Sequence, residues 1–99
     1  MKQFKLPSSF QLGGQTINVL LKDGLSKSDA HGLCRYDDGE IWFDSNIKPH
    51  DLKGITFYHE LMHMLFNTLG QETMRDNEGL VDSIGNLLWQ AHKTMEYDK

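Results

Sequence analysis

Two histidines and a glutamate in the second half of the chain have the residue types and the spacing of a metal site. They form the motif His59-Glu60-Leu61-Met62-His63. On a helix, residues four apart lie on one face, one turn apart, so both imidazoles could reach one ion. Zinc binds imidazole nitrogens at about 2.0–2.1 Å and keeps one position open in catalytic sites. Glu60 would accept a proton from a metal-activated water as that water attacks a carbonyl group.

Two histidines require a third protein ligand, and Glu78 is the residue that we expect to supply it. Two histidines with one glutamate form a known catalytic zinc set. Glu78 lies near the start of a second expected helix, just across the turn from the first. Asp82 follows one turn later on the same face. Its carboxylate could there accept a hydrogen bond from the ring N–H of His59 that does not face the metal. The sequence therefore predicts one zinc ion held by His59, His63 and Glu78, with Asp82 behind them.

The same residues also have ordinary interpretations. His59 and His63 could be surface histidines of an amphipathic helix, with Glu60 a solvated carboxylate. Glu78 could be an acid in the first turn of a helix, where the helix dipole favours negative charge. Asp82 could be a solvated helix residue. Because the motif fixes only three positions, the metal interpretation depends on the capped helix around it and on the nearby Glu78.

Two helices are expected to position these residues. The first runs over residues 51–69, with Asp51 as its N-cap and Gly70 just beyond its C-terminal end. The second begins at residue 76 or 77 and ends near residue 95. The short connection makes the two helices roughly antiparallel neighbours.

Apolar residues at helical spacing give each helix a face for packing. They are Ile55, Tyr58, Met62, Leu65 and Leu69 in the first helix, and Leu80, Val81, Ile84, Leu87, Leu88, Ala91 and Met95 in the second. Gly79 and Gly85 are unfavourable inside a helix, so we expect them to admit a neighbouring backbone or a bulky side chain. Trp89 is expected to belong to the core.

The first half of the chain predicts two β-hairpins. Their strands cover residues 10–12 and 15–21 around Gly13-Gly14, and residues 32–36 and 40–44 around Asp37-Asp38-Gly39. Gly-Gly and Asp-Gly between β-prone segments are typical of hairpin turns. The expected fold class is α+β: a small antiparallel sheet of two hairpins followed by two packed helices that carry the metal site. Residues 1–99 are expected to form a single domain.

Composition restricts the expected partners. The net charge is −4 and acids and bases are interspersed, which argues against a nucleic-acid-binding surface. Cys34 is the one cysteine, so no intrachain disulfide can form. The N-terminus has no apolar run typical of a signal peptide, and no apolar stretch approaches the ~20 residues needed to cross a bilayer. We therefore expect a cytoplasmic protein without nucleic-acid or membrane partners.

The motif H-E-x-x-H followed on the next helix by E-x-x-x-D resembles the gluzincin group of zincin metallopeptidases. The resemblance covers His59 to Asp82. In size and layout the chain is similar to the very short zincins of phages and bacteria, of the ImmA/IrrE and SprT-like kinds. The resemblance implies a zinc metallopeptidase that hydrolyses a peptide bond. The interval from His63 to Glu78 is shorter than in larger gluzincins, whose C-terminal domain has no counterpart in these residues.

The resemblance also implies where a peptide or protein substrate would bind. In zincins, an edge strand upstream of the active-site helix lies along the cleft, and an extended substrate can pair with it. The strand Glu40–Asp44 comes last before that helix and is the expected partner. The alternative is that this strand is paired on both sides and exposes no edge.

Two other functions remain open, and a third is set aside. The chain could be a non-catalytic zinc-bearing binding or regulatory domain, or a metal-free interaction module. Peptide deformylases also contain H-E-x-x-H, with an upstream cysteine ligand, but the sequence around Cys34 lacks their Glu-Gly-Cys-Leu-Ser pattern. Cys34 is instead expected to be a small buried hydrophobe. For the donor to an oxyanion, His31 and Tyr36 are better placed than His92 or Tyr97, which lie far along the second helix.

Overall fold

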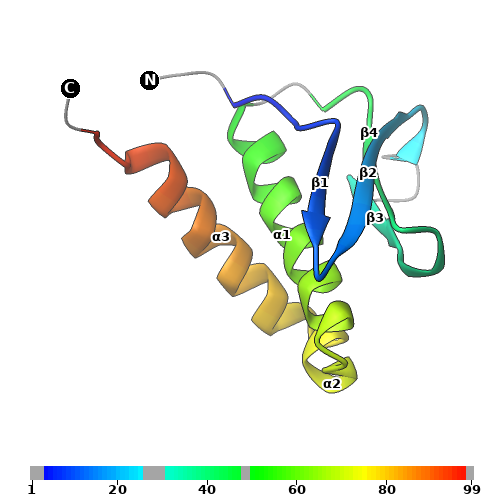
Figure 1. Ribbon diagram of the computed structural model, residues 1–99. Coiled ribbons are helices and arrows are strands. Elements are labelled where there is room, and N and C mark those ends of the chain that lie inside the picture. The colour runs from blue at the N-terminus through cyan, green and yellow to red at the C-terminus, as the bar shows by residue number, and fades with distance from the viewer. Residues whose placement is uncertain (1–3, 26–30, 48–49, 98–99) are drawn as a thin grey trace.

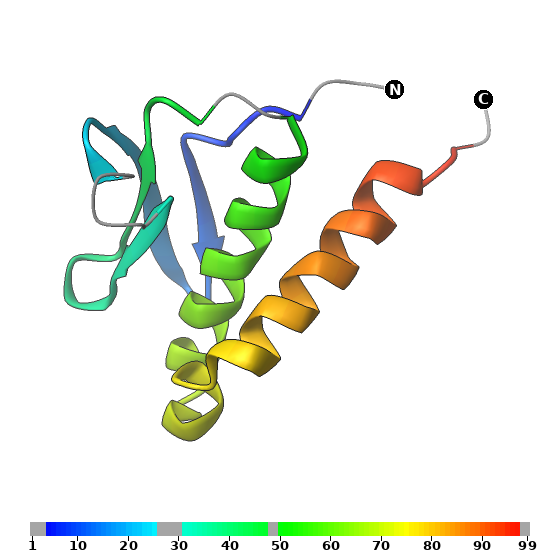
Figure 2. The ribbon, with the colours of Figure 1, turned by 180° about the vertical axis from the view of Figure 1, so that it is seen from behind.

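The computed structural model describes residues 4–25, 31–47 and 50–97. The elements are β1 (Ser9–Leu12), β2 (Gln15–Lys22), β3 (Gly32–Arg35), the 3-10 turn η2 (Tyr36–Asp38), β4 (Glu40–Asp44), α1 (His50–Thr68), α2 (Glu72–Arg75) and α3 (Glu78–Thr94). The helix α1 lies between the four-stranded sheet and α3 (Figures 1 and 2). The predicted α+β class is confirmed.

Both predicted hairpins are present, but the sheet that they form is mixed. Its strand order is β1-β2-β4-β3. The turn of the first hairpin contains Gly13 and Gly14, both with positive φ, and that of the second ends at Gly39, with φ 64°. The hairpins join through β2 and β4, which run parallel. The expectation of a purely antiparallel sheet is therefore wrong, because turn signals fix each hairpin and not the way in which two hairpins pair.

The strand β4 is central, which corrects the expected substrate strand. Ile41 pairs with Val19 of β2 on one side and with Cys34 of β3 on the other. Ile41 and Phe43 are fully buried, so the most apolar strand takes the position with neighbours on both sides. The backbone of Glu40–Asp44 is thus used within the sheet and offers no edge. Within the described ranges, β3 forms one edge of the sheet and β1 the other.

The helix ends follow the predicted signals closely. α1 covers the predicted residues 51–69 with a shift of one residue at each end, and Gly70 follows with φ 74°. Asp51 lies inside the first turn and is not the N-cap. The side chain of Asn77 caps α3 by accepting from the N–H of Leu80 at 3.0 Å. The short helix α2 was not predicted. No helix in the described part of the chain is both long and apolar enough to cross a membrane.

The core differs from the predicted stripes because α1 is covered on two sides. Toward the sheet, α1 buries Phe57 and Met64 against the strands. Toward α3, it buries Met62 and Phe66. The single apolar stripe predicted for this helix cannot describe both buried faces. The stripe also included Leu69, which is 63% exposed. On α3 only one face meets α1, so Val81 and Trp89 are buried while the apolar residues Leu87, Leu88 and Met95 of the predicted stripe are exposed.

Two glycines let α1 and α3 approach closely. A Cβ on Gly85 would lie 3.0 Å from the backbone nitrogen of His59, so the predicted use of Gly85 is confirmed. A Cβ on Gly54 would lie 2.3 Å from the ring of Trp89. Gly79 has no such neighbour, since the nearest atom, on Asn77, would be 3.7 Å away. The expectation that Gly79 also admits a close contact is wrong.

Candidate metal centre

The polar side-chain atoms of His59, His63 and Glu78 converge on one point. The two Nε2 atoms are 3.2 Å apart. Glu78 places Oε2 3.2 Å from Nε2 of His59 and Oε1 3.1 Å from Nε2 of His63. Ligand atoms around a tetrahedral zinc with bonds of 2.0–2.1 Å would be about 3.3 Å apart. The three side chains therefore have the spacing of a metal ligand set.

The geometry arises from one helix face and one reversal of the chain. His59 and His63 are one turn apart on α1, and their rings lie 4.9 Å apart. The chain then turns through Gly70 and α2, so that α3 begins beside them with Glu78 as its first residue. The side chain of Glu78 is 70% exposed, while that of His63 is 9% exposed. An ion could thus reach the centre from solvent, with the imidazoles forming its inner side.

The tautomer of His63 is fixed by a backbone carbonyl. Its Nδ1 lies 2.7 Å from the carbonyl oxygen of Arg75, which can only accept, so Nδ1 carries the proton. In a neutral imidazole, Nε2 then presents a lone pair toward Glu78. A lone pair and a carboxylate oxygen at 3.1 Å repel one another unless a cation or a second proton lies between them. A histidine that binds a metal needs this tautomer, with the proton on Nδ1 and the lone pair of Nε2 directed at the ion.

Asp82 of α3 lies near His59, and the backbone carbonyl of Arg75 in α2 binds His63. Nδ1 of His59 is 3.7 Å from Oδ1 of Asp82, which is the side where the sequence placed this carboxylate, although beyond hydrogen-bond length. The carbonyl of Arg75 was not predicted as a partner, because no side-chain pattern reports where a backbone oxygen will point. The Arg75 guanidinium donates to Asn67 at the end of α1 and to Asp76, which fixes α2 beside the site.

The side chain of Glu60 packs against β3 and lines the same cleft as the three ligand residues. It is 7% exposed and lies under β3, where Cys34 contacts it. Burial raises the pKa of Glu60 above the ordinary glutamate value, while nearby His59 and the Cys34 thiol oppose that shift. A carboxylate with a raised pKa is a better proton acceptor near neutral pH. Its position next to the two imidazoles is therefore compatible with a general base.

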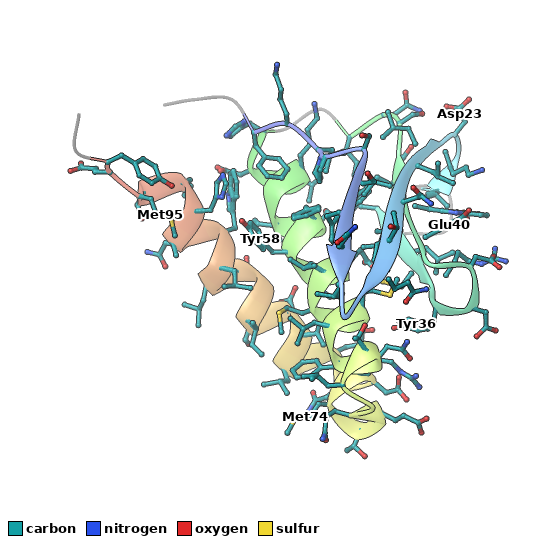
Figure 3. The ribbon with its side chains drawn as sticks, viewed as in Figure 1. Asp23, Tyr36, Glu40, Tyr58, Met74 and Met95 are labelled. Atoms are coloured by element: carbon teal, nitrogen blue, oxygen red, sulfur yellow. The ribbon has the colours of Figure 1, made fainter. Side chains whose placement is uncertain are left out.

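These residues line a cleft of about 590 Å³, bounded by β3, α1 and the start of α3. His31 and Tyr36 also line it, as expected for residues that could meet a substrate. Burial, and then the neighbouring Cys34, raise the pKa of Tyr36 to about 12, so its hydroxyl stays protonated. Figure 3 shows Tyr36 between the β3–β4 turn and the C-terminal part of α1. In contrast, His92 contacts the hydroxyl of Tyr58 at 2.9 Å, away from the cleft.

Two contributors to the site were missed. Gly32 and Cys34 lie two residues apart on β3, so both face α1, and both line the cleft. The sequence predicted Cys34 only as a buried hydrophobe, whereas its sulfur also lies within hydrogen-bond reach of Glu60. Alternation along the predicted strand places Gly32 and Cys34 on one face. It could not show which residue of the helix they meet.

Comparisons with protein-family models, with curated proteins and with solved structures find no match to this chain. The resemblance to zincins therefore remains a prediction carried by His59 to Asp82.

Proposed function

We propose that this chain is a zinc-dependent peptidase, with His59, His63 and Glu78 as metal ligands and Glu60 as general base. The carrying observation is the convergence of two imidazole nitrogens and a carboxylate within 3.1–3.2 Å. The bond from His63 to the Arg75 carbonyl supports it, since it directs the other ring nitrogen toward the centre. The competing explanation is a protonated histidine paired with Glu78, which metal analysis distinguishes.

The proposed roles follow from where each side chain lies. A bound zinc ion would supply a Lewis acid that polarises a carbonyl and lowers the pKa of water. Glu60 would take the proton from the attacking water and pass it to the leaving amine. The protonated hydroxyl of Tyr36, which lines the same cleft, is placed to donate to the carbonyl oxygen as it gains charge.

The substrate strand of this proposal is β3, in place of Glu40–Asp44. Gly32, Leu33 and Cys34 line the cleft, and within the described ranges β3 is an outer strand of the sheet. An extended peptide could pair with its outward N–H and C=O groups by strand addition. That arrangement would bring a peptide carbonyl toward the ligand centre, with affinity derived largely from main-chain contacts.

Metal content and hydrolysis test the proposal together. We expect about one zinc per chain in protein purified without chelator, and its loss on His63→Ala. Glu60→Gln should retain zinc and reduce cleavage of a mixture of unstructured peptides by about 10² to 10⁴. Glu96→Gln removes the same charge at an exposed position of the C-terminal segment and serves as the matched control.

The outcomes separate the three functions considered. Zinc content unaffected by His63→Ala would refute the metal site. Stoichiometric zinc without cleavage of any peptide would favour a non-catalytic zinc-bearing domain. Equal cleavage by the wild type and Glu60→Gln would exclude Glu60 as the base.

A further inference from the structure

The inner face of β3 is shaped around the side chain of Glu60. A Cβ on Gly32 would lie 2.8 Å from Cγ of Glu60, closer than side chains tolerate, and 3.2 Å from its Cδ. The absence of a side chain at Gly32 thus leaves the space in which Glu60 runs. Two residues further along the same face of β3, Cys34 meets the carboxylate. The strand therefore offers Glu60 a groove and, at its end, a hydrogen-bond donor.

The thiol of Cys34 contacts Glu60 at two points. Its sulfur lies 3.3 Å from Oε1 and 3.2 Å from the backbone oxygen of the same residue. Burial raises the pKa of the Cys34 thiol, so the group keeps its proton and acts as a donor. A thiol is a weak donor, but a charged acceptor strengthens the hydrogen bond. The single S–H proton of Cys34 thus has two acceptors within reach on Glu60, its carboxylate and its backbone oxygen.

We propose that Cys34 is a positioning residue that orients the carboxylate of Glu60, an inference that rests on the proposed peptidase function. With Oε1 held by the thiol, Oε2 is the oxygen that would accept the proton of the attacking water. Loss of the thiol would leave the carboxylate in its groove but free to rotate about its last bond. The cost would fall on the chemical step, since both hydrogen-bond contacts of the Cys34 thiol are with Glu60, the general base of the proposal.

Two substitutions separate the donor from the space that it fills. Cys34→Ala removes the donor and should lower kcat about tenfold or more, with KM and zinc content little changed. Cys34→Ser keeps an O–H donor of similar shape and should restore most of that loss. Equal kcat in wild type and Cys34→Ala would overturn the proposal. Equal losses in the alanine and serine variants, at unchanged thermal stability, would overturn it as well.

A spectroscopic measurement tests the same contact without any turnover. Cys34 is the one cysteine of the chain, so the infrared S–H stretching band has a single source. We expect this band at a lower wavenumber in wild type than in Glu60→Gln, whose neutral amide oxygen accepts more weakly. A band at the same position in both would mean that the thiol bonds only to the backbone oxygen, and would overturn the role of Cys34.

The two measurements also separate this inference from the function beneath it. Peptide cleavage with an unshifted S–H band would leave the peptidase standing and remove Cys34 from it. A shifted band without cleavage of any peptide would refute the peptidase and, with it, a catalytic purpose for the contact. A shifted band together with the kcat loss in Cys34→Ala and its recovery in Cys34→Ser would establish both.

Discussion

At the scale of single residues, the polar atoms of the site divide into those that face a common centre and those held by the surrounding protein. Nε2 of His63 faces Glu78, while its Nδ1 donates to the carbonyl of Arg75. Glu60 has its carboxylate beside the thiol of Cys34. Held groups of this kind lower the reorganisation needed when charge develops, which is why partners of ligands matter almost as much as ligands.

Gly32→Ala tests whether Glu60 needs the groove in β3. The new Cβ would lie 2.8 Å from Cγ of Glu60 and 3.0 Å from Cγ2 of Thr56, so Glu60 must move. A displacement of about 1 Å at a reacting group can reduce the rate about 10²-fold. We expect a loss of that order in peptide cleavage, with zinc content retained. Arg35→Ala changes the same strand on its opposite face and should leave cleavage near the wild-type rate. Unchanged cleavage in Gly32→Ala would contradict the groove.

At the scale of elements, the crossing of α1 and α3 depends on Gly85. An alanine there would place Cβ 3.0 Å from the nitrogen and 3.1 Å from Cα of His59, and backbone atoms cannot yield easily. Overpacking costs about 1–3 kcal/mol, against a gain of about 1 kcal/mol in helix propensity. We expect Gly85→Ala to lower the free energy of unfolding by up to about 2 kcal/mol and to weaken zinc binding.

Gly79→Ala is the matched control for that substitution, because it lies on the same helix and would meet only Asn77, at 3.7 Å. It should be neutral or stabilising by up to about 1 kcal/mol. Urea unfolding and zinc titration of both variants provide the measurement. Similar stability changes in the two glycine variants would show that the helix contact is looser than described.

The far ends of the same two helices are joined by Asp51. Its Oδ1 accepts from Nε1 of Trp89 at 2.9 Å and lies 3.4 Å from Nζ of Lys93. The Trp89 bond, and then Lys93, lower the pKa of Asp51. Because the pKa is lower in the folded state, the contribution is present above the unfolded aspartate pKa of about 3.9 and is lost as pH falls through the folded value.

Asp51→Asn should therefore destabilise the protein near neutral pH. In acid it should have no such effect, because the wild-type carboxyl group is then protonated and also neutral. The test is urea unfolding at pH values from neutral to acid. Asp37→Asn, in the exposed β3–β4 turn, is the control. A stability difference that stays constant down to pH values below the folded pKa would show that charge at Asp51 is not the cause.

Local signals predicted the elements better than their assembly. The Gly13-Gly14 turn and Gly70 each act within a few residues, and the structure confirms both. The second helix was expected to begin at residue 76 or 77, and Asn77 is its N-cap. The parallel pairing of β2 with β4 is a long-range choice that no turn residue encodes. The short helix α2 has no apolar period, so nothing in the sequence separated it from a loop.

The site shows the same division. Helical spacing was enough to bring His59 and His63 together, and the short turn brought Glu78 to them. The contact between Cys34 and Glu60 joins residues 26 positions apart, and its form depends on how β3 lies over α1. The Arg75 carbonyl is a backbone group and carries no residue-type signal at all.

At the scale of the whole molecule, a metal would join two helices of a chain with a small core. Ligands that bind only the folded state add about 2.7 kcal/mol at a free concentration of about 100 Kd. For a domain of this size that corresponds to a rise of about 10–20 °C in melting temperature. We expect a chelator to lower the melting temperature of zinc-loaded wild type by that order.

The double variant His59→Ala, His63→Ala is the control, since it should respond to neither chelator nor zinc. Thermal unfolding followed by circular dichroism gives both melting temperatures. An equal response to chelator in the two proteins would mean that the ion does not contribute through this site.

The placement of α3 outside α1 has a consequence for local unfolding. Its principal contacts are with α1, while α1 also packs on the sheet (Figure 1). α3 can therefore detach as a cooperative unit at a lower free energy than the rest of the fold, and its amide hydrogens would exchange with solvent first. A ligand shared between His59 and Glu78 would close that opening. Metal binding should therefore slow amide hydrogen exchange along α3. Hydrogen exchange would then measure occupancy of the site without any substrate.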